Sequence, residues 1–246
     1  MRMLNITADA RTNFPKLSLS IATTREELRE IQRLRYKVFI EAMGLTALSN
    51  DDGLDADEYD AYCDHLIVRD SSTLKVVGTY RLLSTAGVRE IGSFHSEKQF
   101  DLAHLNRFRA RIVEAGRACI HPDYRNGGVI MLLWAGIVAY MRRERCDYLI
   151  GSASIILADG GHNAAAVCQS LSRTHLAPPE YRVLPHVPFP LHHLECCQHG
   201  QVPPLLKGYM RHGAWICGEP AWDADFHCAD LFLLLPLVKL NKRSFV

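Results

Sequence analysis

The segment from residue 111 to residue 144 constrains the fold of this chain more than any other. We predict a strand over 111–120 and an apolar helix over 127–144, joined by the junction His-Pro-Asp-Tyr-Arg-Asn-Gly-Gly. Glycines allow a close backbone approach, and the first N–H groups of a helix have no intrahelical partner. This order favours an α/β fold with an anion-binding helix N-terminus. An ordinary strand-to-helix turn is the alternative interpretation.

The remaining periodicity predicts a mixed central sheet of about seven strands with helices on both faces. Thr24 and Glu27 form a capping box that begins a helix running to about Met43 and ending at Gly44, and a second helix is predicted over 161–174. We expect the sheet to be splayed between the strands at 111–120 and 147–154. Further strands are predicted from apolar alternation or clustering at 17–23, 62–69, 75–83, 147–156 and 228–235.

Proline placement suggests how the chain is divided. Seven prolines between 178 and 204 forbid long regular elements there. We therefore predict a core of residues 1–175 and a proline-rich extension of residues 176–246, whose final strand completes the same domain. Acidic side chains around Gly53 predict that residues 49–60 are solvated and mobile.

Composition narrows the partners and the compartment. The 28 basic and 27 acidic residues nearly balance, so we expect no nucleic acid partner. No apolar run approaches the roughly 18 to 20 residues of a membrane span, and residues 1–20 contain no signal-peptide core. The eight cysteines include no C-x-x-C pair and indicate reduced thiols. We expect a cytoplasmic protein, soluble or peripheral on the inner face of the membrane.

One group of metal-ligand residue types lies between positions 192 and 199. Adjacent cysteines chelate a single ion poorly, and no matching half-site is spaced elsewhere. We interpret this stretch as a polar loop and predict no metal site. Its members are His192, His193, Glu195, Cys196, Cys197 and His199.

Several motifs resemble a known superfamily. Arg125-Asn-Gly-Gly resembles the acyl-donor loop of GNAT acyltransferases, although the family spacing is Arg/Gln-x-x-Gly-x-Gly/Ala. Segments 34–39, 64–68, 77–81 and 114–117 resemble the branch that contains acyl-homoserine-lactone synthases and N-acyl amino acid synthases. The similarity to enzymes that N-acylate ornithine covers about residues 20 to 240 and includes 206–215 and 229–232.

The resemblance implies a GNAT-like N-acyltransferase. It would move a fatty acyl group, with or without a 3-hydroxyl, from acyl carrier protein to the α-amino group of an amino acid, with ornithine as the first candidate and no cofactor. Acyl-coenzyme A is the alternative donor, because the phosphate loop serves either. Lysine, glycine, glutamine and tyrosine are alternative acceptors, and a non-catalytic acyl-binding module is the alternative class.

The chemistry of amine acylation suggests catalytic residues. An α-amine must lose a proton before it attacks a thioester. We predict Glu114 as the base, directly or through water, and Arg117 as a second catalytic residue, whereas a Glu114–Arg117 salt bridge is the structural alternative. Backbone N–H groups near the end of the strand would stabilise the oxyanion. The predicted donor-binding residues are Ala118, Cys119, Ile120, Arg125, Asn126, Gly127 and Gly128.

By the same resemblance, the acceptor side would contain Arg35, Phe39, Asp64 and Arg81. The alternatives are a solvated charge for Arg35, a core position for Phe39 and a cross-strand pair of Asp64 with Arg81. His65 is either a packed strand residue or a catalytic one. A basic run, Arg107, Arg109 and Arg111, would steer an acidic carrier protein.

Overall fold

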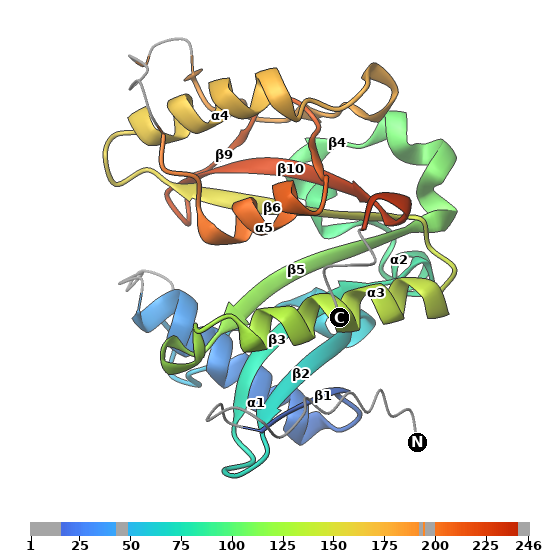
Figure 1. Cartoon of the computed structure of the whole chain (residues 1–246), viewed down its shortest axis with the longest axis vertical. Helices are drawn as coiled ribbons and strands as arrows, with labels where there is room; N and C mark the ends of the chain where they lie inside the picture. Colours follow the sequence, from blue (N-terminus) through green and yellow to red (C-terminus); the bar gives the residue numbers. More distant parts are fainter. Residues whose placement is uncertain (1–15, 43–48, 192–193, 195–199, 241–246) are drawn as a thin grey trace. The chain divides into compact units, whose positions relative to one another are not determined.

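The structure, a computed structural model, describes residues 16–42, 49–191, 194 and 200–240. The chain forms two units. Figure 1 shows the chain coloured by residue number from the N-terminus to the C-terminus. The first contains the residues up to Ile91 together with Ala115–Glu144. The second contains Gly92–Glu114 and the residues from Arg145 onward. Strand β5 (Ile112–Ile120) contributes residues to both units.

The first unit is built on antiparallel strands β1 (Leu17–Ile21), β2 (Asp64–Asp70) and β3 (Val76–Leu83), with β5 next to β3. The turn between β2 and β3 is closed by a hydrogen bond from the N–H of Asp70 to the carbonyl of Lys75 at 3.1 Å. The strands predicted at 62–69 and 75–83 therefore form an antiparallel hairpin.

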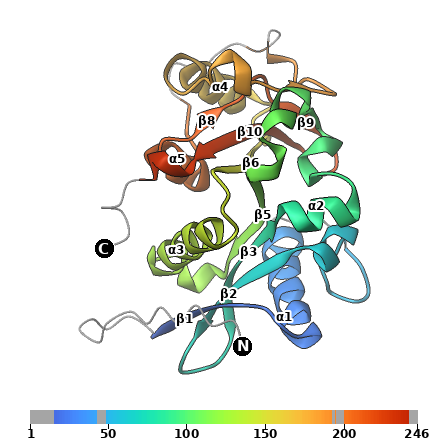
Figure 2. The same ribbon diagram turned by 90° about the vertical axis from the view of Figure 1, so that its right-hand side faces the viewer.

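Helices α1 (Arg25–Tyr36) and α3 (Gly128–Arg143) cover opposite faces of these strands, as Figure 2 shows. Gly78 of β3 permits the close approach of α3, because a Cβ at this position would lie 2.3 Å from Cγ1 of Val129. Gly136 has the same role on the helix side, where a Cβ would lie 2.9 Å from a methyl group of Leu19.

Helix α1 begins as its sequence predicts. The Thr24 hydroxyl accepts from the N–H of Glu27, and the Glu27 carboxylate accepts from the N–H of Thr24, which completes the capping box. The regular helix ends at Tyr36 and continues as a π-helical turn, η1 (Lys37–Glu41). The predicted end at Met43 and Gly44 lies outside the described residues. Among the described residues, the other helical elements of this unit are η3 (Glu58–Tyr62), α2 (Thr85–Ile91) and η6 (Pro122–Tyr124).

The second unit is built around β6 (Tyr148–Ile156) and β10 (Cys228–Pro236), which pair antiparallel over all nine residues. Its segment of β5 pairs in parallel with β6 from Ile112 opposite Tyr148 to Glu114 opposite Ile150. This pairing covers three residues of each strand, as expected for a splayed sheet. Strands β8 (Trp215–Ile216) and β9 (Ala221–Asp223) pair with β10.

Short elements make up the rest of this unit. Helix α4 (His162–Thr174) packs on β6 and confirms the predicted helix over 161–174. The described residues between 178 and 204 form short elements only, and α5 begins at Pro204, where a missing N–H is tolerated. These elements are η4 (His95–Lys98), β4 (Phe100–Asp101), η5 (Ala103–Arg111), η7 (Pro179–Tyr181), β7 (Leu184–Pro185), α5 (Pro204–Arg211) and η9 (Leu237–Lys239).

The contact between β3 and α3 predicts the effect of a single methyl group. We expect Gly78→Ala to lower the free energy of unfolding by about 1–3 kcal/mol, because the added carbon forces Val129 to move. Urea denaturation measures the change. Gly116→Ala is the matched control, since no atom lies within 4 Å of a Cβ there. Equal losses in the two variants would contradict the proposed packing constraint.

Candidate active site

A buried arginine on the inner face of α1 is the centre of the candidate site. Arg35 shares that face with Ile31 and Leu34 and is 0% exposed. Its Nη1 and Nη2 donate to the two carboxylate oxygens of Asp60 at 2.9 and 3.0 Å. Its Nε donates to the Asp55 carboxylate at 2.6 Å, and Nη2 also donates to the Asp55 carbonyl at 2.5 Å. Bidentate, charge-assisted bonds of this kind are among the strongest in proteins.

A second arginine enters the same group of carboxylates from β3. Nη1 of Arg81 donates to Asp57 at 2.5 Å and to Asp60 at 2.8 Å. The guanidinium also lies over the Tyr59 ring, 5.8 Å from its centroid. In the register of β2 and β3, Arg81 is opposite His65. Arg81 and Arg35 therefore hold Asp60 from two different elements.

A third arginine comes from β5 through an unusual backbone conformation. Arg117 has a φ of +53°, in the left-handed region that non-glycine residues seldom adopt within a strand. Its Nη2 donates to Asp57 at 3.1 Å, and its Nε lies 3.5 Å from the Asp55 carboxylate. Strained residues of this kind concentrate at functional sites.

The electrostatics of the network favour its charged form. Burial opposes ionisation of Asp60, but hydrogen bonds from Arg35, Gln32 and Arg81, together with the charge of Arg35, hold its pKa well below its usual range. Burial also opposes ionisation of Asp57, whose pKa is lowered mainly by the charge and hydrogen bond of Arg81. Both carboxyls are therefore ionised at neutral pH.

This network, hereafter the arginine–aspartate network, has a buried side and an open side. The side chains of Arg35, Asp60 and Arg81 are at most 5% exposed. Three other members are between 11% and 22% exposed and form the open edge: Asp55, Asp57 and Arg117. Solvent therefore reaches the side chains of this edge, whereas the other three are almost fully buried.

The prediction that residues 49–60 are solvated and mobile is wrong for the second half of that segment. Asp55, Asp57 and Asp60 point into the unit and are paired with arginines from α1, β3 and β5. A solvated acidic loop and an acidic segment that pairs with buried arginines have the same composition, so composition alone does not distinguish them. Three aspartates close together, with buried arginines on predicted elements, were the signal that was missed.

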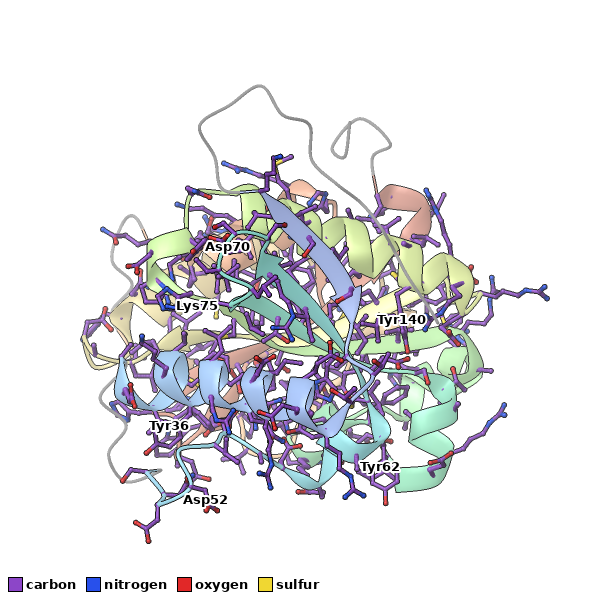
Figure 3. The ribbon with its side chains drawn as sticks, turned by 90° about the horizontal axis from the view of Figure 1, so that it is seen from below. Tyr36, Asp52, Tyr62, Asp70, Lys75 and Tyr140 are labelled. Carbon is purple, nitrogen blue, oxygen red and sulfur yellow. The ribbon has the colours of Figure 1, made fainter. Side chains whose placement is uncertain are left out.

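The structure brings together Arg35, Arg81 and Arg117 but does not bring Asp64 to them. Because side chains alternate along β2, Asp64 and His65 point to opposite faces. Asp64 accepts a hydrogen bond from the Tyr140 hydroxyl of α3 at 2.7 Å; Tyr140 is labelled in Figure 3. Leu82, not Arg81, lies opposite Asp64, so the alternative of an Asp64–Arg81 cross-strand pair is wrong.

Phe39 lies in the π-helical turn η1 and is half-buried. It packs against a small apolar cluster that contains Leu34, Val38 and Cys119. Burial raises the pKa of the Cys119 thiol to about 12, which makes that side chain an inert packing group. The side chain of Cys119 therefore belongs to the core, whereas its backbone remains part of the predicted donor-binding stretch.

The predicted donor loop follows β5 and leads into α3. Gly127 has a φ of +98° and is the residue before the first helical residue, Gly128. The Asn126 carboxamide oxygen accepts from the N–H of Gly128 at 3.3 Å, and Nε of Arg125 donates to the Ile120 carbonyl at 3.3 Å. The loop thus places an exposed arginine beside the N-terminus of a 16-residue helix. That arrangement suits an anion.

Glu114 lies on the part of β5 that belongs to the second unit and is 5% exposed. Its carboxylate accepts from the N–H of His95 at 2.6 Å and from the N–H of Ser96 at 2.8 Å. The Ser96 hydroxyl also donates to it. These bonds orient the carboxylate at the start of η4. Arg117, the partner in the alternative salt bridge, forms ion pairs with Asp57 and Asp55.

Two groups of residues have the chemistry of metal ligands. The predicted cluster between His192 and His199 lies outside the described residues. Within the described part of the chain, Asp223, Cys228 and Asp230 lie close together. The Gln99 carboxamide donates to both of these carboxylates, at 3.2 and 2.8 Å, so a neutral donor already bridges them.

Comparison with known proteins shows that the chain is an acyltransferase of the GNAT class, and β5, its left-handed residue and the glycine turn into α3 lie within the matched stretch. The family model for the acetyltransferase (GNAT) domain matches residues 34–135. FeeM, an N-acyl amino acid synthase from uncultured soil microbes, has a similar structure, with a TM-score of 0.55 and 11% identity over 94% of this chain and 98% of that one. The acyl-homoserine-lactone synthase LasI gives 0.53 and 14% over 91% and 94%.

Sequence similarity to curated proteins is higher. The L-ornithine N(alpha)-acyltransferase of Brucella abortus is 32% identical over 92% of this chain and 86% of that protein. The enzyme of the same name from Rhodobacter capsulatus is 31% identical over 92% of each chain. The chain therefore belongs to the L-ornithine N(alpha)-acyltransferase family.

The depressed pKa values of Asp57 and Asp60 predict how stability depends on pH. As the pH falls below about 4, the unfolded chain takes up protons at these carboxyls before the folded chain does, so this contribution to stability is lost. We expect Asp60→Asn to destabilise the protein by about 3–5 kcal/mol at pH 7, because it leaves buried arginine charge uncompensated.

Urea denaturation of both proteins from pH 7 to pH 3 measures the effect. The difference between wild type and the Asn variant should shrink as the pH approaches 3. A difference that stays constant over this range would show that the Asp60 charge does not contribute to stability.

Proposed function

We propose that this acyltransferase moves a fatty acyl group from acyl carrier protein to the α-amino group of L-ornithine, which gives an N-acyl-ornithine. Family membership supports this acceptor, and the observation that carries the proposal is the charge of the open edge. That edge contains one guanidinium and two carboxylates. Ornithine has one carboxylate and two amino groups that are protonated at neutral pH, so the charges are complementary.

On the acceptor side, Arg117 would bind the carboxylate of ornithine, and Asp55 and Asp57 its amino groups. Arg35 and Arg81 are predicted acceptor residues and would act through the aspartates that they hold, because they are almost fully buried. Phe39 would supply an apolar wall. We assign no acceptor role to Asp64, which is bonded to Tyr140.

On the donor side, we assign Arg125 and the N-terminus of α3 to the phosphate of the pantetheine arm. The helix dipole and the arginine would both favour the anion. Asn126 already caps the Gly128 N–H, so the loop offers fewer free donors than an uncapped helix N-terminus. A loop with few free N–H donors suits the single phosphate of a carrier protein better than the several phosphates of coenzyme A.

In the reaction, the ornithine α-nitrogen forms a bond to the thioester carbonyl carbon, and the carbon–sulfur bond breaks. Glu114 would accept the amine proton, directly or through water, and the carrier thiolate would finally be protonated. Backbone N–H groups of residues 118–120 would stabilise the oxyanion. Arg117 would orient the acceptor for the attack.

The carrier protein itself would be guided by basic side chains of η5. Arg109 is bonded to Glu97 at 2.8 Å, and Arg111 is paired with Asp147. Arg107 is exposed, and its guanidinium lies 4.6 Å from the centroid of the Phe108 ring. We propose Arg107 as the residue of this run that steers an acidic partner.

We further propose that the enzyme works in the cytoplasm and releases its amphiphilic product at the inner face of the membrane as a peripheral protein. Within the described residues, no helix combines the length and apolar character needed to cross a bilayer. Salt extraction of the protein from membrane fractions would support the peripheral location, whereas a requirement for detergent would oppose it.

The proposed reaction is tested by one matrix of assays with purified protein. Acyl carrier protein and coenzyme A thioesters, with and without a 3-hydroxyl group, are each combined with ornithine, lysine, glycine, glutamine or tyrosine. We expect thiol release and N-acyl-ornithine, detected by mass spectrometry, with the carrier-protein donor preferred. Donor binding without thiol release would identify a non-catalytic acyl-binding module.

The first kinetic prediction concerns Asp57 on the open edge. Asp57→Asn removes the charge that would bind an ammonium group, so the KM for ornithine should rise about tenfold to a hundredfold while the donor KM stays unchanged. Asp64→Asn makes the same chemical change outside the network and is the control. Equal ornithine KM values for the two variants would contradict the proposed role of Asp57 in binding the acceptor.

The second concerns Glu114. Glu114→Gln removes the base, so kcat should fall by about 10²- to 10⁴-fold. It should recover in part at high pH, where more of the ornithine α-amine is already deprotonated. Ser96→Ala, which deletes one donor to this carboxylate but keeps the base, is the control for its structural role. If Ser96→Ala lowers kcat as much as Glu114→Gln, then Glu114 acts by anchoring η4.

The third concerns the donor loop. A Cβ at Gly128 would make ordinary contacts, at 3.5 Å from a methyl group of Leu17, so Gly128→Ala should be tolerated. Gly128→Leu should place its side chain where the phosphate approaches and raise the donor KM by tenfold or more. Initial-rate measurements over both substrates separate the effects. Equal increases in the donor and ornithine KM values would indicate general misfolding.

A further inference from the structure

Asp60 is the most fully bonded carboxylate of the network, and one of its donors is neutral. Arg35 donates to both oxygens, and Arg81 donates to Oδ1. The fourth donor is the Gln32 carboxamide, whose Nε2 lies 2.9 Å from Oδ2. Gln32 is 8% exposed and precedes Arg35 by three residues, so the two side chains leave the same face of α1.

The main chain of Asp60 is held separately. Nε2 of His65 lies 3.0 Å from the Asp60 carbonyl. Burial lowers the pKa of His65, which favours the neutral ring with its proton on Nε2, facing that carbonyl. His65 therefore fixes the backbone, and the rotation of the carboxylate is left to its side-chain donors.

Gln32 also holds the other end of the segment that supplies the aspartates. Its main-chain carbonyl accepts from the N–H of Asp55 at 3.2 Å, while its side chain donates to Asp60. One residue of α1 thus spans Asp55 to Asp60, and Asp57 lies between these two anchors. A neutral amide does this without changing the balance of three arginines and three aspartates.

We propose that Gln32 is a positioning residue for the acceptor. By fixing Asp60, it sets the angle at which Arg81 meets Asp57, and Asp57 faces the acceptor on the open edge. Gln32 itself touches no substrate. This inference rests on the proposed function, because it assumes that the open edge binds the amino acid.

Two substitutions isolate this role. Gln32→Met keeps the length and volume of the side chain but removes the donor to Asp60. Gln32→Glu keeps the shape and places a second carboxylate against Asp60 at neutral pH. As the pH falls, the new carboxyl is protonated and donates to Asp60 as the amide does. Arg29→Met, at an exposed position of the same helix, is the control.

We expect Gln32→Met to raise the KM for ornithine roughly tenfold, with the donor KM unchanged and kcat within about threefold of wild type. For Gln32→Glu, the ratio of its ornithine KM to that of wild type should fall as the pH is lowered from 8 to 6. A merely structural role would lower the thermal midpoint of unfolding without this pH signature. Arg29→Met should match wild type throughout.

The inference is overturned if Gln32→Met keeps the wild-type ornithine KM, or if the donor and ornithine KM values rise together. It is also overturned if the KM ratio for Gln32→Glu is independent of pH. Wild-type turnover with ornithine tests the proposed function by itself. If wild type prefers another amino acid of the panel, the same ratios are measured with that acceptor. Without turnover, calorimetric affinities for ornithine replace the KM values.

Discussion

The pairing of Arg35 with Asp60 is the interaction on which the described structure of the first unit most depends. Neither side chain is more than 4% exposed, so each charge is tolerable only because the other is present. Buried pairs of this kind add little net stability compared with apolar packing, but losing one partner is costly. The pair therefore fixes where the segment from Asp55 to Asp60 lies.

Strand β5 links this network to the residues that we propose bind the acyl donor. Its left-handed residue, Arg117, carries a guanidinium to Asp57, and three residues earlier Glu114 is bonded to the start of η4. After Ile120 the same strand leads through the glycine turn into α3. Residues proposed for acceptor binding, proton transfer and phosphate binding thus follow one another along a single stretch of chain. The strained backbone at Arg117 is maintained because the ion pairs of Arg117 and the long helix α3 hold the chain around it.

Much of the fold was predictable because its signals are local. The capping box at Thr24, the hairpin and the turn at Gly127 depend on residues within a few positions of one another. The arginine–aspartate network was not predictable, because Asp60 meets Arg35 across 25 positions of the sequence. An acidic segment that pairs with buried arginines also has the same local composition as a solvated acidic loop. The sequence alone could not show which of Asp64 and His65 lies near the network, because neighbouring strand residues face opposite sides and only the register places His65 opposite Arg81.

We propose above all that the open edge of the network binds a diamino acid through complementary charges. A crystal structure of the protein with L-ornithine tests it most directly. The account predicts the carboxylate of ornithine on Arg117 and an amino group within hydrogen-bond distance of Asp57 or Asp55. Ornithine bound elsewhere, with these three side chains paired as they are now and no contact to the ligand, would contradict it.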